Sequence, residues 1–129
     1  MIVDSSVWIQ ELRSERGTFA EFIALKSAHI DELAVTEPVL MEVFAGARDF
    51  ERVRARLSAL PIRGIDPARD YFAAAALFRA ARASGRTIRS LNDCLIAAVA
   101  LRHGDAVVHR DSDFEALAQV SDLRTVDLR

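Results

Sequence analysis

The sequence predicts an α/β fold in which a central parallel sheet is flanked by helices in three layers, α/β/α. Short apolar runs rich in β-branched residues, typical of buried parallel strands, alternate along the chain with longer segments that have helical apolar spacing. In addition, two of these apolar runs are followed at once by acidic residues. In open α/β sheets the carboxyl ends of the strands form the edge where ligands bind, so this pattern also predicts a functional site.

The chain begins with a short apolar run that ends at an acid. Ile2 and Val3 are apolar and β-branched, which favours a strand buried on both faces. Asp4 follows directly, and Ser5 and Ser6 add two short hydroxyl groups at the end of the strand. Such residues commonly cap the next helix, and this segment by itself favours that role for Asp4. The alternative is that Asp4 forms one wall of a metal site.

Apolar spacing predicts the elements of the rest of the first half. The predicted helices cover 6–12, 19–26, a segment that follows Thr36 and contains the apolar residues from 39 to 44, and 49–57. The predicted strands cover 33–35 and 60–65. The last is expected at the edge of the sheet, because Pro61 cannot donate to a ladder. Thr36 can cap the helix that follows it, and Pro38 suits the first turn of that helix. Glu42 lies in this helix and, taken alone, is an ordinary surface glutamate.

The second half continues the alternation. It contains a long alanine-rich helix at 67–83, an apolar helix from 90 to 103, a strand at 106–109, a helix at 114–120 and a strand at 125–126. Phe72, Leu77 and Phe78 of the alanine-rich helix can pack against the core or against a second copy of the chain. A dimer face on this helix is therefore one of the predictions.

Two further groups of acids stand at the ends of these elements. Ser90 and Asp93 have the spacing of a capping box, which would give Asp93 a purely structural role. However, the helix behind Asp93 is apolar nearly all round and therefore buried, and an acid at the mouth of such a helix favours a concave site. The strand at 106–109 is followed by Asp111 and Asp113, so two strands lead into carboxylates.

Length and composition indicate an ordinary globular protein. The 129 residues are one domain's worth, so we expect a single domain over 1–129. No apolar stretch is long enough to span a bilayer and no basic leader is present, which predicts a cytoplasmic protein without a membrane partner. The lone cysteine, Cys94, is expected to fill space in the core. The net charge is −2, and it becomes +3 if cations neutralise a cluster of five acids, which permits a polyanionic partner. The five acids are Asp4, Glu42, Asp93, Asp111 and Asp113.

The acids predict a chemistry once they are placed on a wound sheet. The four acids that can then converge at the carboxyl edge of the sheet are Asp4, Glu42, Asp93 and Asp111. Like charges about 4 Å apart repel by several kcal/mol even at an effective dielectric of about 20, so a bound cation is needed. Oxygen ligands without a cysteine set or a histidine pair select Mg²⁺, with Mn²⁺ as a substitute. Such ions support hydrolysis of phosphodiester bonds.

These motifs together resemble the PIN-domain ribonucleases, and their order and the chain length are similar to the VapC toxins of VapBC toxin–antitoxin modules. The resemblance covers essentially the whole chain and rests on four segments. They are Asp4-Ser5-Ser6 after a strand, Glu42 in an apolar helix, Asn92-Asp93 at a helix start, and Asp111-Ser112-Asp113-Phe114 after a strand. It implies a PIN-like fold and a Mg²⁺-dependent endoribonuclease acting on structured RNA such as tRNA or rRNA. It also implies a homodimer and inhibition by a cognate VapB-like antitoxin.

The resemblance also assigns roles to residues. It implies four catalytic and metal-binding acids, Asp4, Glu42, Asp93 and Asp111. Asp113 becomes an auxiliary metal ligand through water, Ser6 the hydroxyl that orients the first acid, and Asn92 a neighbour of the third. His109 stands where many relatives have a small hydroxyl residue; we interpret it as a satisfied histidine at a strand end and leave it out of the catalytic set.

Arginines supply the candidate RNA contacts. Lys26 is the only lysine, so nearly all positive charge is arginine, which binds phosphate as a fork. Arg86, Arg89 and Arg110 are the candidate RNA-binding residues, although a solvated basic face is the simpler interpretation of such a run.

Three other classes of protein share part of this pattern. A phospho-acceptor receiver domain needs a lysine near its last strand, and a dehalogenase-type phosphatase needs an aspartate where Ser6 stands. The stronger alternative is a PIN-fold module that binds RNA or protein without cutting, which the intact set of acids disfavours.

Overall fold

The computed structural model of the protein describes residues 1–13, 24, 28 and 32–129. The helix predicted at 19–26 lies largely outside these residues. Among the described helices, none is long and apolar enough to cross a membrane.

A parallel sheet forms the centre of the molecule. Strands β1 (Ile2–Val3), β2 (Val107–His109) and β3 (Thr125–Asp127) pair in the order β1-β2-β3, with β1 and β3 both parallel to β2. On the far side of β1, single parallel bridges join Ile2 to Ala34 and Val35 to Ile62. The sheet thus continues beyond β1, but the strands predicted at 33–35 and 60–65 are reduced to these bridges.

The weak pairing at the outer edge has a local cause. Pro61 accepts a hydrogen bond from the Val35 amide at 3.0 Å, and Arg63 donates its amide to the Val35 carbonyl at 2.7 Å. Because proline has no amide hydrogen, Pro61 cannot take part in a further strand pair, and the edge position predicted for it is confirmed.

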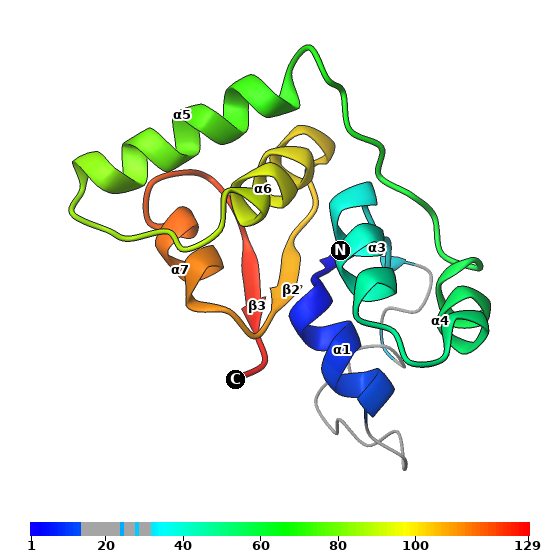
Figure 1. Ribbon diagram of the computed structural model, residues 1–129. Coiled ribbons are helices and arrows are strands. Elements are labelled where there is room, and N and C mark those ends of the chain that lie inside the picture. The colour runs from blue at the N-terminus through cyan, green and yellow to red at the C-terminus, as the bar shows by residue number, and fades with distance from the viewer. Residues whose placement is uncertain (14–23, 25–27, 29–31) are drawn as a thin grey trace.

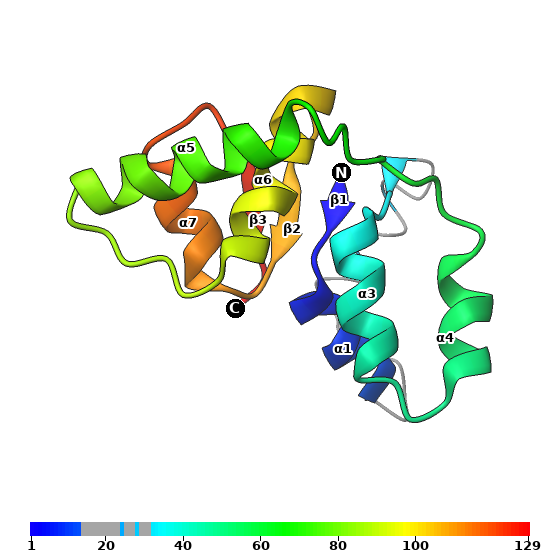
Figure 2. The ribbon, with the colours of Figure 1, turned by 45° about the horizontal axis from the view of Figure 1, so that its top comes forward.

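Helices cover both faces of the sheet, as Figures 1 and 2 show. The described helices are α1 (Ser5–Arg13), α3 (Glu37–Ala45), α4 (Phe50–Leu57), α5 (Asp70–Ala83), α6 (Leu91–His103) and α7 (Ser112–Ala118). In both views α1, α3 and α4 lie on one side, and α5, α6 and α7 lie on the other. The predicted three-layer α/β/α architecture is therefore confirmed.

Helix α6 is the most deeply placed of these helices. Its residues from Asp93 to Ala100 are all buried, including Cys94, which confirms the predicted place of that side chain in the core. Gly104 ends the helix in a left-handed conformation with φ of 71°, which glycine adopts without strain. The helix packs mainly against α5, and its first turn opens toward the carboxyl edge of the sheet.

Two predicted helix starts are wrong by two or three residues. Helix α7 begins at Ser112 instead of residue 114, because the Asp111 side chain caps it by accepting the Asp113 amide hydrogen at 2.9 Å. Helix α5 begins at Asp70 instead of residue 67, because the Asp66 amide donates to the Asp70 carboxylate at 2.7 Å and holds the preceding residues in a turn.

Candidate active site

Five acids from separate parts of the chain meet at the carboxyl edge of the sheet. We call them the acidic cluster; it consists of Asp4, Glu42, Asp93, Asp111 and Asp113. Asp4 follows β1 directly and Asp111 follows β2 by two residues. The other three lie on helices whose first or second turns face this edge.

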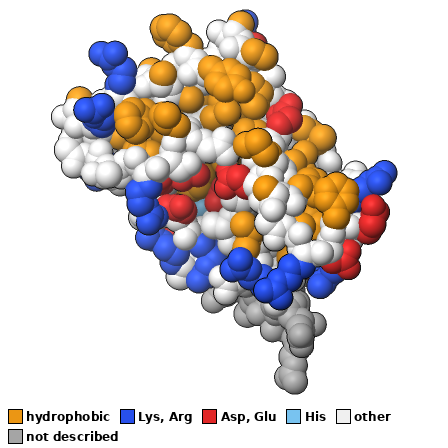
Figure 3. All heavy atoms as spheres, viewed as in Figure 1, with side chains coloured by type: hydrophobic (Ala, Val, Ile, Leu, Met, Phe, Trp, Pro, Cys, Tyr) orange, Lys and Arg blue, Asp and Glu red, His pale blue; other side chains and the backbone are white. Residues whose placement is uncertain are grey.

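The carboxylates of the acidic cluster lie close enough to interact. One oxygen each of Asp93, Asp111 and Asp113 lies within 4.8 Å of the others. The charge of Asp4 acts on Asp93, and the charge of Glu42 acts on Asp4. The structure therefore brings all five predicted acids into one site. Figure 3 shows acidic side chains gathered in a hollow near the centre of this face, with Lys and Arg side chains along its lower border.

Asp4 is held by the start of the following helix. One of its oxygens accepts the Ser6 amide hydrogen at 3.0 Å and the Ser6 hydroxyl at 2.5 Å. The same hydroxyl oxygen accepts the Arg110 amide hydrogen at 3.0 Å, which ties the end of β1 to the end of β2. Asp4 thus caps α1 and also belongs to the acidic cluster, so the two alternatives for this residue hold together.

Glu42 is bound from two sides. The Ser5 hydroxyl donates to one carboxylate oxygen at 2.8 Å, and the Asn92 side-chain amide donates to the other. Glu42 is therefore more than a surface glutamate, and Asn92 links α6 to α3. The contact of Ser5 was missed in the sequence, where only its place between Asp4 and Ser6 could have suggested it.

Asp93 does not form the capping box that its spacing allows. Among the described residues, the Ser90 side chain makes no capping bond to α6. Asp93 is instead 5% exposed and points into the acidic cluster. A purely structural role as a cap is therefore wrong for this residue, because burial of the helix start turns the side chain inward.

Burial makes two carboxylates of the cluster hard to ionise. It raises the pKa of Asp93 to about 9, helped by a hydrogen bond with Asp113 and by the charges of Asp4, Asp111 and Asp113. Burial also raises the pKa of Asp4, partly offset by the hydrogen bonds from Ser6. Within the described part of the chain, Asp4 Oδ1 and Asp93 Oδ2 are buried and have no hydrogen-bond partner.

Asp113 anchors the loop before α6. It is 1% exposed, and its Oδ2 accepts the amide hydrogens of Arg89 and Ser90, each at 3.0 Å. The Arg89 guanidinium, itself well exposed, donates to Asp111 Oδ1 at 2.9 Å. Of the three arginines predicted to bind RNA, Arg89 is the one with this contact to the acidic cluster.

The other two arginines are placed differently. Arg86 is exposed beyond the end of α5. The Arg110 guanidinium donates to the Leu128 carbonyl and so binds the C-terminal segment.

The donors present fit a hard divalent cation. The ligand atoms are carboxylate oxygens, which Mg²⁺ and Mn²⁺ prefer. A buried carboxylate oxygen without a partner costs free energy, and two such oxygens belong to the same cluster. A cation held by the cluster would give such an oxygen a partner and would lower the repulsion among the acids.

Comparison with known families decides the relationship of the chain. The family model described as PIN domain matches residues 1–120. The chain is a PIN domain. It is also 39% identical to VapC ribonuclease Mb1587 of Mycobacterium bovis and to ribonuclease VapC11 of Mycobacterium tuberculosis, over 100% of this chain and 99% of each relative. This PIN domain therefore belongs with the VapC ribonucleases, as the resemblance of its motifs implied.

Solved structures agree on the fold. VapBC from Salmonella typhimurium, bound to DNA, matches with a TM-score of 0.79 at 16% identity, over 99% of this chain and 97% of that one. VapBC2 from Rickettsia felis, bound to a promoter DNA fragment, matches with a TM-score of 0.77 at 17% identity, over 98% and 96%. The predicted PIN-like fold is thus confirmed.

Proposed function

We propose that this PIN domain is a Mg²⁺-dependent endoribonuclease of the VapC toxin type, which hydrolyses phosphodiester bonds of structured RNA such as tRNA or rRNA. The observation that carries the proposal is the acidic cluster with its two buried, unpartnered carboxylate oxygens. The names of the VapC ribonucleases that resemble the whole chain support the same reaction.

Each member of the cluster has a proposed role. Asp4, Glu42, Asp93 and Asp111 hold the cation, and Asp113 acts on it through water. When bound, Mg²⁺ supplies a lowered pKa for attacking water and stabilisation of the charge that develops on phosphate oxygens. Mn²⁺ can replace it.

The neighbouring polar residues keep these carboxylates in place. Ser6 binds one oxygen of Asp4 and leaves the other for the cation. Ser5 and Asn92 each bind one oxygen of Glu42, so the direction of that side chain is set by α1 and α6 together. Fixed ligands reduce the reorganisation needed when substrate and cation arrive.

The proposed partners are a cognate VapB-like antitoxin and a second copy of the chain. The antitoxin is supported by the VapBC structures from Salmonella typhimurium and Rickettsia felis, which share the fold of this chain. The homodimer is supported by α5, where Leu77 packs in the core while Tyr71 and Phe72 are exposed, Phe72 at 82%. Leu77 therefore packs against the core, whereas Phe72 is exposed and available to pack against a second copy of the chain.

The experiment that tests the function is RNA cleavage by the purified protein with Mg²⁺ and with EDTA. Total tRNA and rRNA serve as substrates, and the ends of the products are sequenced. We expect discrete internal cuts with Mg²⁺ and none with EDTA. Binding of RNA without any cut in Mg²⁺ or Mn²⁺ would instead support the non-cleaving PIN-fold module.

Arg89→Ala should weaken binding of RNA without weakening binding of the cation. An exposed cation at the rim of the site adds only modestly to phosphate binding because solvent screens it, so we expect KM for RNA to rise by about fivefold. Because Arg89 also neutralises Asp111, its removal should leave Mn²⁺ affinity equal or higher.

The matched control for this prediction is Arg54→Ala on α4. Arg54 is similarly exposed and pairs with Glu51, outside the acidic cluster. An unchanged KM in Arg89→Ala, or an equal rise in both variants, would contradict the assignment of Arg89.

A further inference from the structure

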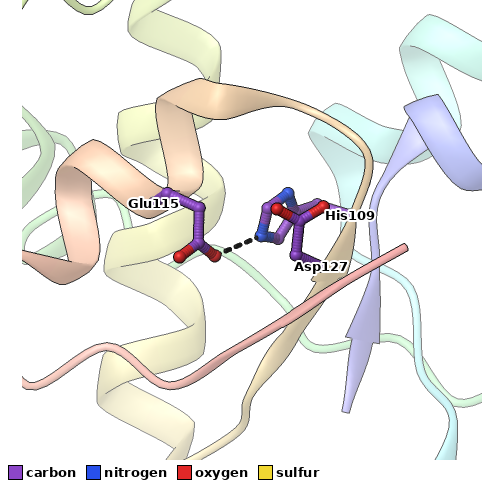
Figure 4. A group of neighbouring side chains, drawn as sticks. All are labelled: His109, Glu115 and Asp127. Atoms are coloured by element: carbon purple, nitrogen blue, oxygen red, sulfur yellow. Dashed lines mark hydrogen bonds and ion pairs between the residues drawn. The ribbon is translucent and has the colours of Figure 1, made fainter. Parts of the chain in front are cut away.

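His109 is fully buried beside the acidic cluster without being one of its members. It ends β2, and its ring packs on Phe114 of α7 with 5.2 Å between the ring centroids. Both ring nitrogens have partners. Nδ1 lies 3.1 Å from the Asp111 amide nitrogen, and Nε2 lies 2.9 Å from a carboxylate oxygen of Glu115, as Figure 4 shows for the second contact.

These two contacts assign the tautomer of the ring. An amide nitrogen only donates, so Nδ1 accepts the Asp111 amide hydrogen and carries no proton of its own. Nε2 then carries the proton and donates it to Glu115. The Thr125 hydroxyl donates to the same Glu115 oxygen at 2.6 Å, so β3 and α7 together fix the orientation of the ring.

The backbone around His109 is held on both sides. The Leu128 amide donates to the His109 carbonyl at 2.8 Å, which joins the C-terminal segment to the end of β2. The next residue, Arg110, donates its amide to Ser6, which holds Asp4. Asp111 then donates its amide to the His109 ring and presents its carboxylate to the cluster. Two successive amides, those of Arg110 and Asp111, are thus fixed by side chains.

Asp127 approaches the same ring, and the three side chains in Figure 4 could be taken for a second metal site. The hydrogen bonds argue against this interpretation. Both nitrogens of His109 are already used, and the carboxylate of Asp127 pairs with the Arg129 guanidinium at 2.9 Å. The contact with Glu115 is better explained as fixing the His109 ring, which binds the Asp111 amide hydrogen.

We propose that His109 is a positioning residue, which sets the direction of the Asp111 carboxylate toward the cation by binding the Asp111 amide hydrogen. This inference rests on the proposed function, because it assigns a purpose to a ligand of that site. The two hydrogen bonds of the ring confirm the interpretation of His109 as a satisfied histidine at a strand end, and the proposal adds a role to it. The side chain that follows a fixed amide has fewer directions available, so the cation meets an ordered ligand.

Two substitutions test the hydrogen bonds of the two ring nitrogens separately. In His109→Asn, the side-chain oxygen stands in the place of Nδ1 and can accept the Asp111 amide in an Asx turn. In His109→Gln, the side-chain amide stands near the place of Nε2 and can donate to Glu115, while the acceptor for Asp111 is lost. Both variants put a similar amide into the same buried space, so each is the control for the other.

We expect the two variants to differ in the exchange of the Asp111 amide hydrogen before any cation is added. Amide hydrogen exchange followed by NMR should show Asp111 protected in wild type and His109→Asn, and exposed to exchange in His109→Gln. Mn²⁺ titration should give wild-type-like affinity for His109→Asn and about 10- to 100-fold weaker affinity for His109→Gln, the range found for residues that support metal ligands. With RNA, His109→Gln should lower kcat and leave KM nearly unchanged.

Equal exchange at Asp111 and equal Mn²⁺ affinity in the two variants would overturn the proposal. One measurement on wild type guards against a variant that fails to fold: long-range ¹H–¹⁵N spectra of the ring must show the proton on Nε2. A proton on Nδ1 would overturn the proposal without any substitution. If wild type instead binds Mn²⁺ but cuts no RNA, the proposed function fails while the exchange and affinity results still judge His109.

Discussion

Asp93→Asn is expected to reduce RNA cleavage at least ~100-fold and, at the same time, to stabilise the protein without metal at pH 8. Loss of a cation ligand removes several kcal/mol of transition-state stabilisation, and each ~1.4 kcal/mol is a factor of ten in rate. The gain in stability has a separate cause. Asp93 is buried and one of its oxygens has no partner among the described residues, so its charged form destabilises the folded state.

The size of this stability change depends on pH. The pKa of Asp93 is about 9 in the folded protein and 3.8 when unperturbed, so the folded state holds a proton that the unfolded state releases. Its contribution to stability is complete below pH 3.8 and is lost as pH rises toward 9. A neutral asparagine avoids this loss. We therefore expect little difference near pH 4 and, at pH 8, a Tm higher by at least ~3 °C in the variant.

Thermal unfolding in EDTA at pH 4 and pH 8, together with cleavage assays in Mg²⁺, measures both effects. Asp122→Asn is the control, because Asp122 is exposed and lies outside the acidic cluster. Cleavage that survives in both Asp93→Asn and Asp4→Asn would refute the assignment of the active site. A fall in Tm of Asp93→Asn at pH 8 would refute the electrostatic account of Asp93.

Addition of Mg²⁺ or Mn²⁺ at pH 8 is expected to raise the Tm and so to oppose the loss of stability at high pH. A ligand that binds only the folded state stabilises it by about 2.7 kcal/mol at 100 times its Kd. Because burial raises the pKa values of Asp93 and Asp4, the cation must displace protons in order to bind. The rise in Tm should therefore be largest above pH 8 and should disappear near pH 5.

Calorimetric titration with Mn²⁺ in two buffers of different ionisation enthalpy would count the protons released. The Asp93→Asn variant serves as the control, since it lacks the proton that Asp93 carries. EDTA should restore the lower Tm and stop cleavage of RNA. A rise in Tm of the same size at pH 5 and pH 8 would show that binding is not linked to these carboxylates.

The positions of three of the acids could be predicted because each depends on a local pattern. Asp4 and Asp111 follow apolar runs, and Asp93 stands at the start of an apolar helix. Each of them can therefore be found from the point where the apolar pattern begins or ends. Convergence then follows from the parallel order of the strands. The partners of these acids could not be predicted in the same way. Ser5 meets Glu42 across 37 positions, and Arg89 meets Asp111 across 22.

Element boundaries also divide into those set by local signals and those set by distant residues. The ends of α5 and α6 were predicted well, since Ser84-Gly85 and Gly104 are local stop signals. The strand expected at 60–65 became one bridge at Ile62, because strand length depends on a partner strand that is distant in the sequence.

The amino-acid sequence by itself determined the order of strands and helices and the acids that stand at their ends, because periodicity and turn chemistry act between near neighbours. Only the tertiary structure decided which hydrogen bonds those acids make. It turned Asp93 away from a capping box and into a buried cluster where its pKa is about 9. It also placed Glu115 against His109 and Thr125 against Glu115. Burial and charge at a point in space are set by residues far apart in the chain, so no local pattern contains them.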